Sequence, residues 1–181
     1  MMKKLSILVS ILIFSSMTFA GLTKVYYTAE NVSGNQWVYN YTIINLALTE
    51  GIKEFTIWFD HGKYASIQRE SDPTLDKAWD QVTWQPNESL QNNGGFDVLA
   101  LAAPIEIGDS GVSGFAVYFL WSGTGNPGRQ FFEVVNPDNT SQVLDSGYTI
   151  PEPTSLILLI GSSICLALKR RITTSPVLRE A

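Results

Sequence analysis

Residues 37–44 read Trp-Val-Tyr-Asn-Tyr-Thr-Ile-Ile, an alternation of large apolar side chains with other side chains. Successive side chains of a β-strand point to opposite faces, so Trp37, Tyr39, Tyr41 and Ile43 would share one face. This period of two predicts a strand with one face packed against a hydrophobic core.

The same alternation recurs along the chain on both sides of this stretch. Residues 55–60 and 115–121 show it most clearly, and residues 23–30, 96–102 and 130–135 are further strand candidates. Turns rich in Gly, Asn and Pro separate these segments. Several short strands between such turns predict an all-β fold, an antiparallel β-sandwich that is jelly-roll-like or Ig-like.

Three segments depart from the strand pattern. Residues 72–79 predict one short helix, because Asp72 can cap it and Pro73 fits its first position. Residues 81–95 are rich in Asn and Gln and predict a long surface loop, and residues 145–149 predict a linker. Along residues 55–60 the strand pattern places Thr56 on the face opposite the core.

The N-terminal end has the composition of a secretory signal peptide. Lys3 and Lys4 precede an apolar run over residues 5–14, and Thr18-Phe19-Ala20 places small residues before a cut ahead of Gly21. Residues 1–20 are therefore expected to be removed, which leaves one domain over residues 21–148.

The C-terminal end carries a second distinctive pattern. An uncharged apolar run over residues 154–168 follows the triplet Pro151-Glu152-Pro153 and ends at the basic cluster Lys169, Arg170 and Arg171. Fifteen helical residues rise about 22 Å, against a hydrocarbon core of about 30 Å. The pattern predicts a short transmembrane helix over 154–168 within a signal segment 149–171, with 172–181 as a cytoplasmic tail.

Together the triplet, the apolar run and the basic stop resemble the PEP-CTERM sorting signal of Gram-negative bacteria. The resemblance implies that exosortase reads Pro151, Glu152 and Pro153, and that the basic cluster stops transfer through the membrane. It implies an exported precursor, processed by signal peptidase and held in the inner membrane by its C-terminal helix. The mature protein would then reach the cell surface or the extracellular matrix.

Parts of the predicted domain also resemble the exported regions of other small PEP-CTERM proteins. The matching pieces include Phe55–Asp60, Trp79–Pro86, Gly94–Leu101, Gly111–Trp121 and Asn126–Pro137. What this implies is a sorted surface or matrix protein without an assigned activity.

Charge separates the predicted domain from its flanks. Residues 21–150 hold six Lys or Arg against fifteen Asp or Glu, a net charge of −9, whereas the flanks carry +4. Such an acidic domain would repel phosphates, which argues against binding nucleic acid or anionic lipid. Cys165 is the single cysteine, so the domain cannot form an intramolecular disulfide.

Candidate catalytic and metal-binding residues are few. His61 follows Asp60 at a strand end and is interpreted as a surface residue at a turn, since no G-x-S-x-G motif is present. Asp72, Asp76 and Asp80 recur every four residues, but a helix cap followed by a solvated acidic face explains them. We therefore expect no enzyme, no cofactor and no metal site.

Trp58, Trp84 and Trp121 are the tentative glycan contacts among the five tryptophans. Trp84 lies in the predicted loop, Trp121 precedes a Gly-rich turn, and Trp58 falls on the outer face of its strand. Sugar rings stack on exposed aromatic faces, whereas aromatic residues in strands also fill cores.

Three hypotheses about function stay open from the sequence. The first is a structural or interaction protein of the surface or matrix, the second a glycan-binding module of an exopolysaccharide matrix, and the third a secreted hydrolase. Exposure of the three tryptophans beside a groove would favour the second, and a pair of carboxylates in a cleft the third. A closed sandwich without a cleft would favour the first.

Overall fold

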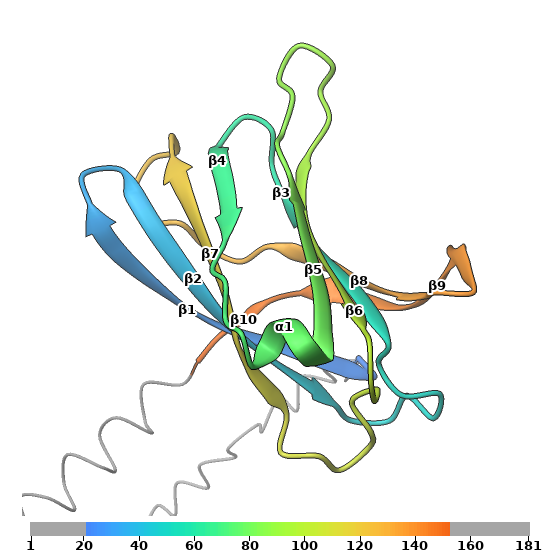
Figure 1. The fold of residues 1–181 in the computed structure, drawn as a ribbon. Helices are drawn as coiled ribbons and strands as arrows, with labels where there is room; N and C mark the ends of the chain where they lie inside the picture. The colour runs from blue at the N-terminus through green and yellow to red at the C-terminus, as the bar shows by residue number, and fades with distance from the viewer. Residues whose placement is uncertain (1–20, 153–181) are drawn as a thin grey trace, which may run out of the picture.

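The computed structural model describes residues 21–152, which form two five-stranded sheets (Figure 1). Sheet I has the order β10-β1-β2-β7-β4, with β1 Thr23–Ser33, β2 Gln36–Asn45, β4 Tyr64–Arg69, β7 Val112–Trp121 and β10 Ile150–Pro151. Sheet II has the order β5-β6-β3-β8-β9, with β3 Glu54–Phe59, β5 Trp79–Trp84, β6 Gly94–Ala100, β8 Phe131–Asn136 and β9 Asn139–Tyr148. The single helix α1 in this part of the chain spans Leu75–Ala78.

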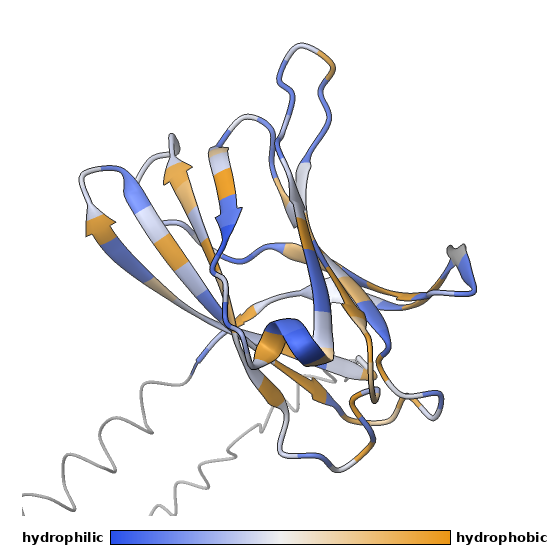
Figure 2. Cartoon of the chain, viewed as in Figure 1, coloured by the Kyte–Doolittle hydropathy of each residue, from blue (hydrophilic) through white to orange (hydrophobic). Residues whose placement is uncertain are grey.

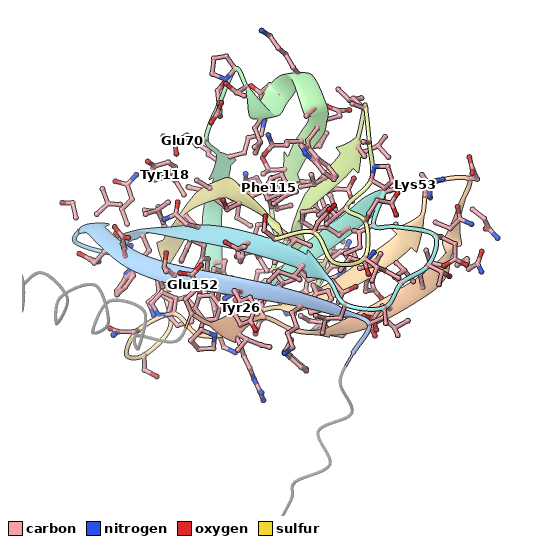
Figure 3. The ribbon with its side chains drawn as sticks, turned by 90° about the horizontal axis from the view of Figure 1, so that it is seen from below. Tyr26, Lys53, Glu70, Phe115, Tyr118 and Glu152 are labelled. Carbon is pink, nitrogen blue, oxygen red and sulfur yellow. The ribbon has the colours of Figure 1, made fainter. Side chains whose placement is uncertain are left out.

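The two sheets enclose one core built from the alternating positions. Tyr39, Tyr41 and Ile43 of β2 are fully buried, as predicted, and Phe55 of β3 meets Phe115 of β7 at 5.5 Å between ring centroids. Bands of opposite hydropathy follow one another along the strands in Figure 2, and Figure 3 places Phe115 between the sheets. The predicted all-β sandwich is confirmed.

The outer face of sheet II is less open than the alternation suggests. Thr56 retains only 6% of its surface, because β3 lies in the middle of the sheet and the hydroxyl of Thr56 donates to Asp97 Oδ1 at 2.6 Å. The strand pattern therefore places Thr56 correctly on the face opposite the core, but that face is closed to solvent at this residue. Neighbouring side chains on both flanking strands cover it.

The predicted loop at residues 81–95 is wrong at its two ends, whereas residues 85–93 form an irregular and mostly exposed connection, as predicted. Trp79 to Trp84 form the edge strand β5, and β6 begins at Gly94, so only the connection between them is irregular. Trp79 and Gln81 are buried, and the Gln81 amide donates to Asp76 Oδ1 at 3.1 Å. A buried glutamine with a hydrogen-bond partner behaves as a core residue, which polarity alone does not reveal.

The predicted linker at residues 145–149 is also wrong. Most of it belongs to β9, which pairs with β8, and Thr149 is buried against Gln130. Ile150 and Pro151 then pair with β1 in parallel, so one pair of strands departs from the expected antiparallel arrangement. The folded domain extends through Glu152, past the expected boundary at 148.

Both predicted membrane-directed segments, residues 1–20 and 154–171, lie outside the described residues, as does the tail 172–181. Among residues 21–152 no helix is long and apolar enough to cross a membrane. The signal peptide, the transmembrane helix and the basic stop therefore stay predictions.

Candidate functional site

A groove of about 870 Å³ lies where the end of β3 meets the beginnings of β4 and β8. Its lining comes from Trp58 and the following turn, from Asn93, from residues between Trp121 at the end of β7 and Glu133 in β8, and from Tyr148 at the end of β9. Segments far apart in the sequence therefore meet here, since pairing places β3 beside β8 and β8 beside β9.

Aromatic side chains form much of the groove. Trp121 packs on Tyr64 with centroids 4.9 Å apart, and its indole N–H donates to the carbonyl of Gly125 at 2.8 Å. A Cβ at Gly123 would overlap the Trp121 ring, so this glycine permits the ring to lie against the backbone. These contacts fix the orientation of the Trp121 ring before any ligand arrives.

Trp58 forms another part of the wall. Its indole N–H donates to Glu133 Oε2 at 2.9 Å, and its ring meets Trp84 edge-on at 5.6 Å. Trp84 is 36% exposed and donates its own N–H to the carbonyl of Asn93, but it does not line the groove. The structure thus brings Trp58 and Trp121 to one groove and leaves Trp84 beside it.

Charged groups in the lining balance one another. Asp60 pairs with Lys63 at 2.9 Å, and this hydrogen bond lowers the pKa of Asp60 below its ordinary value. Arg129 lies 4.7 Å above the centre of the Tyr148 ring, a cation–π contact. With Glu133, the lining holds two acidic and two basic side chains, so the groove is formally neutral within an acidic domain.

His61 lines the same groove in the turn after β3. Its backbone N–H donates to Asn93 Oδ1 at 3.1 Å, and its Nδ1 lies 3.1 Å from the same oxygen. Its Nδ1 also lies 3.9 Å from Asp60 Oδ1, because β3 has ended and the two side chains no longer alternate. The expected turn position is confirmed, whereas the sequence did not place this histidine in the lining.

A buried polar network supports the groove from below. Tyr39 donates to the carbonyl of Gly128 at 2.7 Å, and its oxygen lies 3.1 Å from that of Tyr64. Gln130 accepts a hydrogen bond from Tyr41 at 3.1 Å and donates one to Tyr64 at 3.2 Å. Burial raises the pKa of Tyr64, so its hydroxyl stays protonated at neutral pH. Such a satisfied network holds the lining in one arrangement.

Sequence reasoning missed several lining residues, above all Phe131, Tyr148, Arg129 and Gln130. Phe131 looked like an ordinary residue of a strand, and Tyr148 fell in the predicted linker. A signal that could have found Phe131 and Tyr148 is that each is an aromatic residue at one end of its strand. These two residues pair directly across β8 and β9.

Of the three aspartates singled out in the sequence, Asp72 and Asp76 serve internal contacts and Asp80 is exposed. Asp76 receives hydrogen bonds from Arg69 at 2.8 Å and from Ser71 at 2.9 Å, while Asp72 accepts from the backbone N–H of Thr74 at 2.7 Å. No group of three His, Cys, Asp or Glu suited to a metal ion occurs within residues 21–152.

Two residues of the triplet, Pro151 and Glu152, lie at the edge of sheet I. The backbone N–H of Glu152 donates to Tyr27 O at 2.9 Å, and its carboxylate accepts from the Thr42 hydroxyl at 3.3 Å. Figure 3 shows Glu152 beside β1. Pro153 and the cluster Lys169, Arg170 and Arg171 lie outside the described part of the chain.

No protein-family model and no curated protein sequence matches the chain. Solved structures that resemble it distantly include two cohesin–dockerin complexes. A type I cohesin–dockerin complex from Clostridium thermocellum is 12% identical with a TM-score of 0.34, over 71% of this chain and 92% of that chain. The CaDoc0917–CaCohA2 complex is 15% identical with a TM-score of 0.32, over 67% and 86%. Likenesses of this size carry no argument about function.

Proposed function

We propose that the chain is an exported protein of the cell surface or extracellular matrix, and that it binds a neutral glycan in the groove beside Trp58 and Trp121. The groove carries the proposal, because it combines fixed aromatic rings with hydrogen-bonding side chains. Sugars present apolar C–H faces and polar hydroxyl edges, and a site of this mixed kind complements both.

The charge distribution favours a neutral ligand. The lining holds equal numbers of acidic and basic side chains, whereas residues 21–150 carry −9. An acidic polysaccharide would meet repulsion from the whole domain without gaining a basic patch in the groove. A neutral glycan avoids this repulsion and still finds hydrogen-bond partners.

The contacts of the two carboxylates in the groove support binding of a glycan without its hydrolysis. The carboxylates Asp60 and Glu133 each hold a protein partner, Lys63 and the Trp58 indole respectively. Hydrolysis of a glycosidic bond usually needs one carboxyl that is protonated at neutral pH. The lowered pKa of Asp60 leaves it ionised and unsuited to that role.

Export and sorting complete the proposal. They rest on the signal-like N-terminal segment and on the triplet, apolar run and basic stop of the C-terminal segment. A protein delivered to a polysaccharide-rich surface is one for which a glycan-binding groove has a use.

Affinity electrophoresis of the full chain in a mild detergent tests the binding proposal. Gels containing neutral glucan, mannan or xylan should retard the wild type, with or without EDTA, whereas a polyuronate gel should not. Trp121→Ala and Tyr148→Ala should lose the retardation. Tyr26→Ala, an aromatic substitution on sheet I away from the groove, serves as the matched control. A wild type that migrates freely through every neutral gel would refute the proposal.

A further inference from the structure

The strand register of sheet II aligns aromatic residues across its outer face. Trp84 of β5 pairs with Gly95 of β6, and Gly95 pairs with Trp58 of β3. Trp58 in turn pairs with Phe131 of β8, which pairs with Tyr148 of β9. Directly paired residues point to the same face, so these four aromatic side chains form one row, which we call the aromatic row.

Contacts between neighbours hold the row together. Trp84 meets Trp58, and Phe131 meets Tyr148, each edge-on with centroids 5.6 Å apart. A Cβ at Gly95 would overlap the Trp84 ring, so the absence of a side chain there lets Trp84 lean towards Trp58. Trp84 and Tyr148 at the two ends are 36% and 55% exposed.

The row is longer than the groove. Three of its members, Trp58, Phe131 and Tyr148, line the groove, and Trp84 continues it beyond the lining. Five strands spaced about 4.8 Å apart give the row a span of about 19 Å. A surface of this length can contact several sugar rings in succession.

A polar row runs parallel to the aromatic row. Asp97 of β6, Thr56 of β3, Glu133 of β8 and Ser146 of β9 are paired in sequence across the same face. Thr56 itself is buried, whereas the carboxylates of Asp97 and Glu133 and the hydroxyl of Ser146 can form hydrogen bonds with hydroxyl groups along the edge of a sugar chain. The two rows together offer an apolar track with a polar border.

We propose that the aromatic row extends the groove into a track for a flat, ribbon-like neutral glycan made of equatorially linked pyranose rings, lying across the strands of sheet II. The inference rests on the proposed function, because the groove is one end of the track. Ribbon-like chains present their ring faces in a line, as a straight row of aromatic side chains requires. A helical glycan would meet only part of the row.

Chain-length dependence of binding tests the track. Isothermal titration of the full chain should show cellohexaose binding about tenfold more tightly than cellobiose, a difference of about 1.4 kcal/mol, since the longer chain stacks on more rings of the row. Trp84→Ala should remove most of this gain. Val143→Ala, which removes an exposed apolar side chain of β9 outside the row, should keep it.

The possible outcomes test the track and the groove separately. Equal affinities for cellobiose and cellohexaose, or a Trp84→Ala variant that keeps the full gain, would overturn the track while the groove stands. A wild type that binds neither oligosaccharide would overturn the track as well, and the neutral-polysaccharide gels then decide the groove separately. Thermal midpoints of all variants, together with the milder Trp84→Phe, distinguish loss of contact from loss of fold.

Discussion

Two tryptophan rings of this protein each lie against a glycine, which has no side chain to obstruct the ring. Trp84 covers Gly95 and Trp121 covers Gly123, and a Cβ at either glycine would overlap the ring above it. The same two indoles donate to backbone carbonyls, of Asn93 and Gly125. A ring held on both its face and its N–H loses little freedom on binding, which favours stacking with a ligand.

Asp97 gives the first prediction at this scale. Burial raises the pKa of Asp97 above its ordinary value of 3.8, while the hydrogen bond from Thr56 opposes this shift. The folded protein therefore holds this proton to a higher pH than the unfolded chain, and ionising Asp97 costs stability. Asp97→Asn should make the protein more stable than the wild type at about pH 7.

As the pH falls through the raised pKa of Asp97, its carboxylate gains a proton and the wild type should regain the stability lost on ionisation. The difference in stability between the wild type and Asp97→Asn should then shrink. Below the ordinary pKa of an aspartate, Asp97 is protonated in both the folded and the unfolded protein, so the difference in stability should not change further. Urea midpoints between about pH 7 and pH 3 measure the effect, with the exposed Asp138→Asn as the matched control. An Asp97→Asn variant no more stable than the wild type at neutral pH would contradict the reasoning.

Among the elements, β3 has the most demanding position. It lies between β6 and β8 in the middle of sheet II, so both its edges are hydrogen-bonded and its outward side chains lie between those of two neighbouring strands. Phe55, Ile57 and Phe59 fill the core on one side, while Thr56 is buried on the other by its contact with Asp97. A central strand of this kind tolerates polar residues only where a partner is present.

Substitutions on the two faces of β3 test this position. Ile57→Asp should unfold the domain, because it places an unpaired charge in the core. Thr56→Asp should also destabilise strongly, by setting a second carboxylate against that of Asp97. Thr56→Ser keeps the hydroxyl and should cost roughly 1 kcal/mol or less. Urea denaturation measures all three, and a Thr56→Asp variant as stable as the wild type would show that this face is open.

Across the whole molecule, charge is unevenly distributed along the chain, and the C-terminal strand β10 holds part of the proposed sorting triplet. The domain is acidic, its groove is formally neutral, and the cationic clusters Lys3–Lys4 and Lys169–Arg171 lie at the chain ends. The strand β10 places the beginning of the proposed sorting triplet on the edge of sheet I. An enzyme that grips this segment in an extended form has to separate Glu152 from Tyr27 first.

The proposed sorting signal makes a prediction about the mature protein. In a host with exosortase, the wild type should be recovered without residues 169–181, whereas Glu152→Ala should remain full-length in the membrane fraction. Neutral residues at Lys169, Arg170 and Arg171 should weaken retention of the precursor, since basic residues fix the cytoplasmic side. Mass spectrometry of the mature C-terminus measures the outcome, and a wild type that keeps Ala181 would sink the sorting proposal.

The fold class could be read from the amino-acid sequence, because burial on one face of a strand imposes a period of two, and residues 37–44, 55–60 and 115–121 show this period clearly. Prediction from the sequence failed at β5 and β10, where the stabilising contacts are not local. Gln81 is buried through its bond to Asp76, and Ile150–Pro151 has too few residues to show a period.

The sequence also singled out Trp58, Trp84 and Trp121 as tentative glycan contacts, without showing which of them lie together. Only the folded protein shows that Trp58 and Trp121 share a groove, and that Trp84 joins a row with Phe131 and Tyr148. The physical reason is strand register: which residues become neighbours depends on how strands far apart in the chain align, and that alignment is fixed by packing of the whole sandwich.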